Sequence, residues 1–178
     1  MIKLRKAVFL DRDGVINHSI VKNGKPFPPS SLAEVKIIDG VTEALSTLRQ
    51  AGFLLIVVTN QPDIARGAIS NSVVEEINNF LKKELLLDDV FMCVHDDKDE
   101  CDCRKPLPGL LLQAAKKYNI DLKKSFMVGD RWKDVEAGRR AGCKTIWIDL
   151  EYDEKKPNIA PNYVAKSLAK AIPWILQI

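Results

Sequence analysis

The chain has 178 residues, of which 46% are hydrophobic and 29% are charged, and its formal net charge is +3. This composition is typical of a globular protein, and we expect residues 1–178 to form a single domain. The mild positive charge falls short of that of a nucleic-acid-binding protein. No apolar run approaches the roughly 20 residues that span a bilayer, and the apolar segment near the start is too short for a signal peptide. We therefore expect a cytoplasmic protein with neither a nucleic-acid nor a membrane partner.

Short apolar runs alternate with amphipathic segments along most of the chain. Apolar residues spaced three and four apart predict a helix over residues 40–52, which ends at Gly52. The continuous apolar run over residues 53–60 is typical of a strand covered on both faces. The expected elements in chain order are strand 6–11, helix 40–52, strand 53–60, helix 70–86, strand 89–94, helix 108–120, strand 125–130, helix 134–143, strand 144–149 and a helical tail, 163–178.

Three local features refine this assignment. Residues 17–39 contain three prolines and little regular pattern, and a connection of this length is usually a functional flap or lid. Ser72 is the expected N-cap of the helix over residues 70–86, because Glu75 follows three residues later. Pro173 is expected to break or kink the helical tail.

The alternation of strands and helices predicts an α/β fold. Right-handed crossovers would give a three-layer, Rossmann-like arrangement, with a parallel sheet and helices on both of its faces. In such sheets, ligands bind beyond the carboxyl ends of the strands. The residues that directly follow the strands are therefore the first candidates for function.

Polar residues cluster at these positions, and we expect them to meet at one edge of the sheet. Carboxylates that converge there need a cation, and oxygen ligands with room for water and phosphate suit Mg²⁺, while lysine and threonine suit phosphate oxygens. One carboxylate could then attack phosphorus and form an aspartyl-phosphate, while a second acts as general acid and base. The candidates are Asp11 and Asp13 after the first strand, Thr59, Asn60 and Gln61 after the second, Arg104 and Lys105 beyond the third, and Asp130 and Asp134 after the fourth.

Taken singly, each of these clusters has an ordinary explanation. Asp11 and Asp13 could belong to a solvated turn, and Arg104 with Lys105 could be a solvated basic pair. An EF-hand calcium loop is excluded, because Gly14 stands too early in the segment. Only the combination of the clusters favours phosphoryl transfer.

Three of the four cysteines lie in one short segment with the second of two histidines. Cys93 and His95 form a C-x-H pair, and Cys101 and Cys103 form a C-x-C pair. A closed set of three thiolates and one imidazole is typical of a structural zinc site, which would fix the loop that leads to Lys105. The alternative is a pair of buried thiols beside a surface histidine. Cys143 stands apart from this segment and is expected to be an inert buried thiol.

With these residues assembled, the chain resembles the haloacid dehalogenase (HAD) superfamily of phosphohydrolases. The segments that match are "DRDG" at 11–14, the threonine after the second strand, the lysine of "CRKP" and "GDRWKD" at 129–134. The resemblance implies that Asp11 is the nucleophile, Asp13 the general acid and base, and Thr59 and Lys105 the phosphoryl-binding residues. It implies that Mg²⁺ is held by Asp11, the backbone carbonyl of Asp13 and Asp130, with Asp134 either a ligand or a partner of one.

A narrower resemblance is to D-glycero-D-manno-heptose-1,7-bisphosphate 7-phosphatases, and histidinol-phosphate phosphatase domains share most of the pattern. It is carried by "DRDGVIN", "TNQPDIARG", the cysteine and histidine pairs and "CRKPLPG". It implies a minimal cap, a monomer and a small phosphorylated metabolite as substrate, with Arg104, Asn60 and Gln61 near the sugar. Asn17 either caps the flap or contacts the substrate.

The chain departs from the heptose group in two places. Residues 62–63 are Pro-Asp, where members of that group usually have Ser-Gly, and the flap has "SIVKNGKPF" in place of a Gly-Tyr element. Despite these departures, the resemblance as a whole favours heptose 1,7-bisphosphate as the substrate, attacked at the 7-phosphate. The alternatives are histidinol phosphate or, in another class, a zinc-stabilised binding module with vestigial catalysis.

Overall fold

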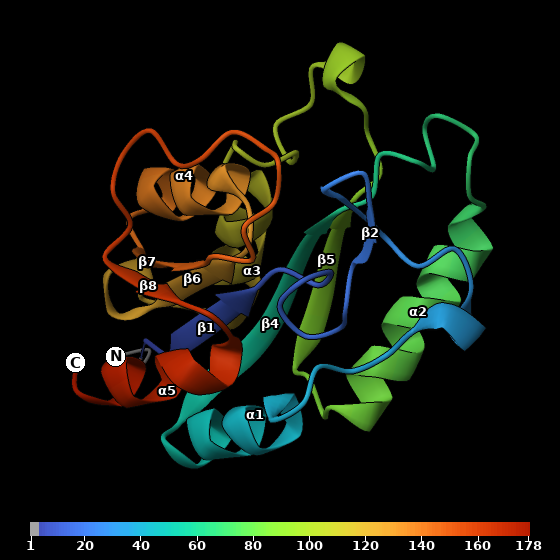
Figure 1. Cartoon of the computed structure of the whole chain (residues 1–178). Helices are drawn as coiled ribbons and strands as arrows, with labels where there is room; N and C mark the ends of the chain where they lie inside the picture. The colour runs from blue at the N-terminus through green and yellow to red at the C-terminus, as the bar shows by residue number, and fades with distance from the viewer. Residues whose placement is uncertain (1–3) are drawn as a thin grey trace.

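A six-stranded parallel sheet forms the centre of the computed structural model, which describes residues 4–178 (Figure 1). All neighbouring strands of this sheet run parallel. The α/β, Rossmann-like fold expected from the sequence is therefore confirmed. The order across the sheet is β5 (Asp89–Cys93), β4 (Phe53–Asn60), β1 (Lys6–Leu10), β6 (Phe126–Gly129), β7 (Lys144–Ile148) and β8 (Tyr163–Ala165).

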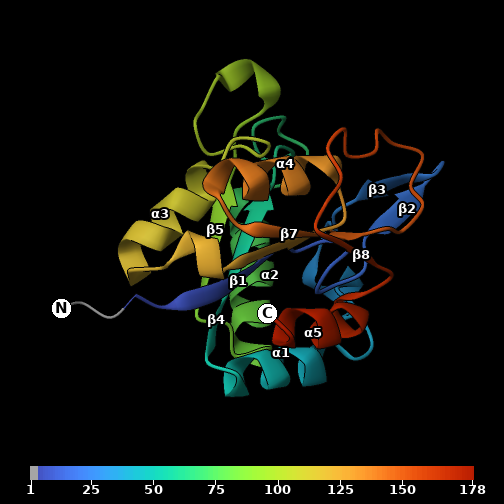
Figure 2. The same ribbon diagram turned by 90° about the vertical axis from the view of Figure 1, so that its left-hand side faces the viewer.

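Helices cover both faces of the sheet, as Figures 1 and 2 show from two sides. One face packs against α1 (Val41–Gln50), α2 (Asn71–Glu84) and α5 (Leu168–Leu176), and the other against α3 (Gly109–Tyr118) and α4 (Trp132–Ala141). The buried residues accordingly fall into two clusters, one on each side of the sheet. None of these helices, within residues 4–178, is long and apolar enough to cross a bilayer.

Strand β4 shows why a continuous apolar run forms a central strand. Successive side chains of a strand point to opposite faces. Leu55 and Val57 belong to the core beneath α1 and α5, whereas Leu54, Ile56 and Val58 belong to the core beneath α3 and α4. Because both faces are covered, both sets of positions must be apolar.

The end of the chain differs from the helix predicted over residues 163–178. Residues Tyr163–Ala165 form β8, the edge strand beside β7, and the helix starts only at Leu168. The Tyr163 ring stacks on Trp174 at a centroid distance of 5.1 Å, which ties this strand to α5. Pro173 does not break α5, because the buried face of the helix compensates for the missing hydrogen bond.

The N-terminus of α2 also differs from the prediction. Ser70, not Ser72, is the N-cap, and its hydroxyl accepts a hydrogen bond from the backbone N–H of Val73 over 3.3 Å. The two serines are spaced so that either could start the helix. The structure shows that the helix begins directly after the first of them.

The flap over residues 17–39 contains more regular structure than the sequence led us to expect. Strands β2 (Ile20–Lys22) and β3 (Lys25–Phe27) form an antiparallel hairpin, and a short 3₁₀ helix follows at Leu32–Glu34. Both turn residues, Asn23 and Gly24, have positive φ angles, as a tight hairpin turn with the twist of its strands requires. The Asn-Gly pair was the signal for this hairpin.

Candidate active site

The carboxyl ends of β1, β4 and β6 bring acids and a lysine together. Asp11 follows β1 directly, and Asp134 lies in the first turn of α4. The Nζ atom of Lys105 donates to Oδ1 of Asp11 over 2.9 Å, to Oδ1 of Asp134 over 2.6 Å and to the carbonyl oxygen of Val58 over 2.7 Å. All three charged side chains are buried, so water competes little for these contacts.

Asp130 lies in the same cluster but makes no such contacts. It is buried, which raises its pKa, and neither carboxylate oxygen has a hydrogen bond of good geometry among residues 4–178, although the nearby Tyr152 hydroxyl lowers that pKa slightly. One carboxylate oxygen each from Asp11, Asp130 and Asp134 lies within 4.8 Å of the others. A Cβ atom at Gly14, where φ is +88°, would clash with Oδ2 of Asp130, so glycine allows this close approach. A buried carboxylate with both oxygens free is costly without a cation, and this donor set suits Mg²⁺.

The pKa shifts in this cluster follow from its burial. Burial raises the pKa of Asp11 to about 6, although Lys105 opposes the shift. Burial also raises the pKa of Asp130 well above its ordinary value, and the charges of Asp11 and Asp134 add to the effect. Burial alone would lower the pKa of Lys105, but the same two carboxylates outweigh it and hold that pKa above the ordinary value. The cluster therefore contains more negative charge than Lys105 alone can balance.

Asp13 is held by hydrogen-bond donors on both of its oxygens. The guanidinium of Arg12 donates to Oδ1 over 3.1 Å and to Oδ2 over 2.9 Å. Asn17 donates to Oδ1 and Gln61 to Oδ2, each over 2.9 Å. The buried Arg12 is in turn fixed by Asn78, whose Oδ1 accepts from it over 2.9 Å. These contacts keep the Asp13 carboxylate, 15% exposed, in one orientation.

The residues after β4 link this strand to the lysine segment. Asn60 and Lys105 exchange two hydrogen bonds of 3.0 Å, one from the Asn60 side chain to the Lys105 carbonyl and one from the Lys105 N–H to the Asn60 side chain. The Thr59 hydroxyl accepts from Gln61 over 3.0 Å. Residues far apart in the sequence are therefore held together by side-chain to backbone contacts at the end of β4.

A cavity of about 260 Å³ opens onto this cluster. Asp11, Asp13, Thr59, Asn60, Lys105, Asp130 and Asp134 all line it, as the sequence predicted for residues near a substrate. The hairpin flap forms part of the wall through residues 25–28. The cavity is also lined by charged residues that the sequence analysis did not identify: Lys25, Asp63, Arg66, Arg131, Lys133 and Glu154.

Three residues predicted to contact substrate lie behind the cavity wall. Asn17 and Gln61 are buried and contact Asp13, as described above. The guanidinium of Arg104 donates to Asp97 over 2.7 Å and to the carbonyl oxygen of His95 over 3.3 Å, within the cysteine loop. None of the three is part of the cavity lining.

Several of the missed residues follow or flank positions that the sequence analysis did identify. Arg131 and Lys133 lie beside Asp130 in "GDRWKD", and Arg66 lies in the segment that follows Gln61. The sequence shows that these residues are basic, but it does not distinguish a basic residue in a cavity from one on the solvated surface. Glu154 belongs to a loop with no motif, and only the tertiary structure places it in the cavity.

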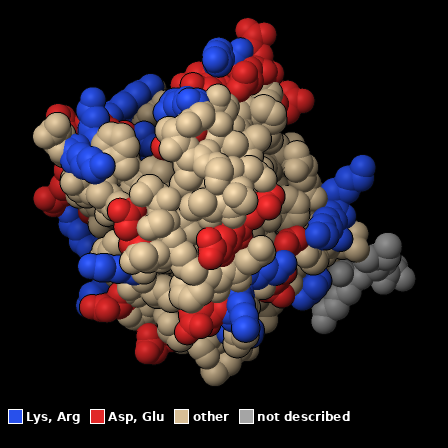
Figure 3. All heavy atoms as spheres, turned by 90° about the vertical axis from the view of Figure 1, so that its right-hand side faces the viewer, with Lys and Arg blue, Asp and Glu red and all other residues tan. Residues whose placement is uncertain are grey.

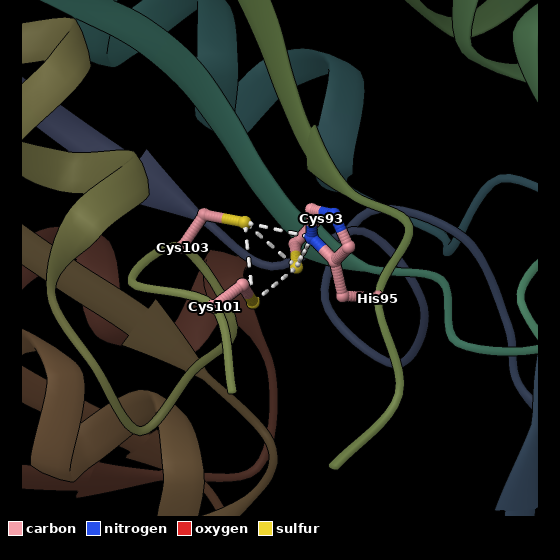
Figure 4. Close-up of side chains that lie close together, drawn as sticks. All are labelled: Cys93, His95, Cys101 and Cys103. Atoms are coloured by element: carbon pink, nitrogen blue, oxygen red, sulfur yellow. Dashed lines mark hydrogen bonds between the residues drawn. The ribbon is translucent and has the colours of Figure 1, made fainter. Parts of the chain in front are cut away.

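Cys93, His95, Cys101 and Cys103 converge beyond the end of β5, with their side chains pointing toward one another (Figure 4). Their ligand atoms lie within 4.8 Å of each other. The Sγ–Sγ distances are 2.9, 3.5 and 3.6 Å, and Nδ1 of His95 is 3.4 Å from Sγ of Cys103. A tetrahedral zinc site with Zn–S bonds of about 2.3 Å requires ligand separations somewhat below 4 Å. This cluster could therefore hold zinc.

Cys143 lies outside this cluster, as expected. It is buried at the end of α4, and burial raises the pKa of its thiol to about 12. It is therefore protonated at neutral pH.

The surface carries charged side chains of both signs. On the face that Figure 3 shows, acidic and basic side chains are interspersed, and no continuous basic stripe is visible. The basic residues that gather in the cavity are matched there by acids.

A parallel α/β sheet with paired carboxylates and a buried lysine at its strand ends defines a hydrolase of the phosphoryl-transfer type. The model of the haloacid dehalogenase-like hydrolases matches residues 30–142, and the chain belongs to this family. The resemblance seen in the sequence is therefore confirmed.

Individual relatives narrow the comparison. The chain is 39% identical to a D-glycero-beta-D-manno-heptose-1,7-bisphosphate 7-phosphatase of Pasteurella multocida, over 93% of this chain and 94% of the relative. A protein of the same name from Helicobacter pylori is 35% identical, over 98% and 99% of the two chains. The crystal structure of D,D-heptose 1,7-bisphosphate phosphatase from B. bronchiseptica, complexed with magnesium and phosphate, superposes with a TM-score of 0.80 at 29% identity and covers 97% of this chain and 98% of that one.

Proposed function

We propose that this chain is a Mg²⁺-dependent phosphatase that removes the 7-phosphate of D-glycero-D-manno-heptose 1,7-bisphosphate through an aspartyl-phosphate. The convergence of Asp11, Lys105 and Asp130 at the floor of one cavity carries the proposal. The names of relatives that match nearly the whole chain support the substrate.

In the first half of the reaction, the Asp11 carboxylate attacks phosphorus and the bond to the sugar oxygen breaks. Asp13 gives its proton to the departing oxygen, which leaves as an alcohol. Thr59 and Lys105 both line the cavity and would donate to the phosphoryl oxygens, Lys105 with the proton that its contact to Asp11 gives up when Asp11 attacks phosphorus. The phosphoryl group is then carried by Asp11 as an acyl phosphate.

In the second half, water attacks the same phosphorus atom. Asp13, now a carboxylate, takes the proton from this water, and the bond between phosphorus and Asp11 breaks to release inorganic phosphate. Arg12, Asn17 and Gln61 hold Asp13 on both oxygens, so it keeps one position for both proton transfers. This accounts for two of the predicted pocket residues, Asn17 and Gln61, as positioning residues.

The residues present fit a magnesium ion. Asp130, with both buried oxygens unpartnered within residues 4–178, would hold it together with Asp11 and the carbonyl oxygen of Asp13. When bound, the ion neutralises charge on the phosphoryl group and orients it. Both oxygens of Asp134 are already engaged, one by Lys105 and one by the backbone N–H of Arg131. We therefore propose that Asp134 chiefly positions Lys105, beside the metal ligands Asp11 and Asp130.

The second phosphate of the substrate requires cations away from Lys105. Lys25, Arg66, Arg131 and Lys133 line the remaining wall of the cavity. Away from the acid cluster, these four basic residues outnumber the two acids of the wall, Asp63 and Glu154, and such a wall disfavours the ammonium group of histidinol phosphate. It therefore favours a bisphosphate over that alternative.

The cysteine cluster is proposed to hold structural zinc. Four protein ligands leave no position for substrate, as in structural sites generally. Since Cys103 precedes Arg104 and Lys105 directly, the metal would fix the start of the segment that carries the catalytic lysine. The binding-module alternative leaves the buried acids and Lys105 unexplained.

We also propose that the chain is one domain and a monomer. One six-stranded sheet lies at the centre of the fold with all five α-helices packed on it, and within residues 4–178 only the β2–β3 hairpin forms a second, smaller sheet, which supports the first statement. Light scattering coupled to size-exclusion chromatography tests the second, with an expected mass near the 20.0 kDa of one chain.

The deciding experiment measures phosphate release from both anomers of heptose 1,7-bisphosphate, from histidinol phosphate and from a broad panel of phosphomonoesters. We expect heptose bisphosphate to have the highest kcat/KM and Asp11→Asn to lose at least about 10³-fold. The exposed Asp39→Asn serves as the matched control. Preference for histidinol phosphate, full activity of Asp11→Asn, or no turnover of any substrate with Mg²⁺ would each refute the proposal.

A further inference from the structure

An ion pair inside the cavity has no part in the reaction described so far. Arg131, the N-cap residue of α4, donates from Nε to Oε2 of Glu154 over 2.8 Å and from a terminal nitrogen to Oε1. Both residues line the cavity, and their side chains are 40% and 20% exposed. The carboxylate of Glu154 thus covers the two-pronged donor face of the guanidinium.

The other cavity cations are paired differently. Lys105 belongs to the acid cluster, and Lys133 faces Asp97, which is not part of the cavity lining. Arg66 donates through two nitrogens to Asp96, also outside the lining, and through one nitrogen, over 3.2 Å, to Asp63 within it. Glu154 differs in that it accepts from two nitrogens of Arg131 and itself lines the cavity. An incoming anion that is to bind Arg131 must therefore replace this carboxylate.

We propose that Glu154 is a specificity-determining residue that occupies, in the free enzyme, the place on Arg131 taken by the non-reacting phosphoryl group of a bisphosphate. A carboxylate and a phosphate present the same pair of acceptor oxygens to a guanidinium. A phosphoryl dianion carries more charge than the carboxylate that it displaces, and a partly exposed ion pair is weak enough to exchange. This inference rests on the proposed function. It names Glu154 as the residue that the second phosphoryl group displaces from Arg131.

Glu154 acts on the two kinds of substrate unequally. A bisphosphate must break the ion pair before it gains Arg131, whereas a monophosphate reacts with the pair intact. Glu154 therefore weakens binding of the bisphosphate, and it re-forms the pair when the monophosphate product leaves. Replacing it should lower KM for the bisphosphate without raising kcat.

A purely structural role for Glu154 makes the opposite prediction. The loop that carries it also contacts the flap, because the backbone N–H of Asp153 donates to the carbonyl oxygen of Gly24 over 2.9 Å. If Glu154 served only to anchor this loop, its loss would loosen the flap. KM would then rise for every substrate.

The test compares Glu154→Gln with the unmodified enzyme on heptose 1,7-bisphosphate and on p-nitrophenyl phosphate, which has one phosphoryl group. We expect KM for the bisphosphate to fall roughly two- to fivefold with no gain in kcat, and the ratio of kcat/KM between the two substrates to rise by a similar factor. Glu151→Gln is the matched control, since Glu151 lies on the same loop but pairs with Lys166 at the surface. It should leave the ratio unchanged.

A double-mutant cycle ties the effect to Arg131. In an Arg131→Gln background, Glu154→Gln should change neither KM nor the ratio, because no guanidinium remains to be released. Glu154→Asp, which keeps the charge but shortens the reach, provides a second variant should Glu154→Gln unfold. It should shift the ratio in the same direction.

Two results overturn the inference. An unchanged or raised KM for the bisphosphate in both Glu154 variants, with normal turnover by the unmodified enzyme, refutes it and leaves the proposed function standing. A full effect in the Arg131→Gln background refutes the link to Arg131. If the unmodified enzyme neither hydrolyses the bisphosphate nor, as Asp11→Asn, binds it in calorimetry, the proposed function fails and the inference with it.

Discussion

The acid cluster around Lys105 and the cysteine cluster are joined through one short segment, residues 93–105, and are built in opposite ways. The acids are buried side chains beside a cavity, and one of them, Asp130, has no hydrogen bond of good geometry to either oxygen within residues 4–178. The cysteines lie on a loop, and their four ligand atoms face only one another. An incomplete ligand set beside a cavity leaves room for substrate, whereas a complete set leaves none. The difference supports the proposal of a catalytic role for the acids and a structural role for the cysteines.

The largest expected effect comes from removing the lysine that balances the buried acids. Lys105→Met should lower the free energy of unfolding by about 3–5 kcal/mol, because two buried carboxylates lose their partner, and it should abolish turnover. Chemical denaturation in magnesium-free buffer without chelator measures the first effect, and phosphate release measures the second.

Lys116→Met makes the same chemical change at an exposed position of α3 and is the control for Lys105→Met. A loss below about 1 kcal/mol in Lys105→Met would mean that the acids are not held as charges by this lysine.

The next effect concerns the cysteine cluster. Protein purified without chelator should contain about one zinc per chain, and Cys93→Ser should reduce this to near zero and lower the melting temperature. Turnover should fall as well, through disorder at the start of the segment that carries Lys105. Metal analysis and thermal unfolding are the measurements, with Cys143→Ala as the control from outside the cluster. Equal zinc content in both variants would contradict the assignment.

The acid cluster should show a pH-dependent response to magnesium. The pKa of Asp11 is raised to about 6 and that of Asp130 is raised well above its ordinary value, both mainly by burial. Since their folded pKa values exceed the unfolded ones, these two groups lower the stability of the metal-free protein as the pH rises from about 4 through 6 and above. Protons compete with the metal below this range, so the melting temperature should gain more from Mg²⁺ at pH 7.5 than at pH 5.5.

Asp130→Asn provides the variant for this magnesium experiment. It removes a buried charge, so it should stabilise the metal-free protein at pH 7.5 and abolish most of the gain from Mg²⁺. A gain from Mg²⁺ that is equal at the two pH values, or intact in Asp130→Asn, would show that the ion binds elsewhere.

The smallest expected effect tests whether the two regions are joined across the cavity. Arg66 donates to both oxygens of Asp96 over 2.9 and 2.7 Å, which links the segment after β4 to the cysteine loop. The Arg66 side chain is 47% exposed, so the pair should contribute little. Arg66→Gln should change KM for a monophosphate by roughly twofold or less and leave zinc content unchanged. A large loss of zinc would show that this pair helps to hold the loop.

Much of the fold could be predicted because the relevant signals are local. The run at residues 53–60 has one explanation, a strand with both faces covered, and it forms β4. The main error was the helix predicted over residues 163–178, because its first three residues form β8. This strand exists because it pairs with β7. A strand that short carries no periodicity of its own, so only its neighbour defines it. The hairpin at Asn23–Gly24 was missed although its turn sequence was in view.

The same distinction between local signals and tertiary contacts applies to the site. The sequence by itself indicated Asp11, Asp13, Lys105, Asp130 and the four cysteine-loop ligands, because strand ends of a parallel sheet meet at one edge and ligand pairs have short, regular spacings. It could not tell that Asn17 and Gln61 hold Asp13, that Arg104 faces Asp97, or that Glu154 covers Arg131. These contacts join residues of separate loops, and the direction in which a loop side chain points is decided by packing. The chemistry was therefore determined by sequence, and the walls of the cavity by tertiary structure.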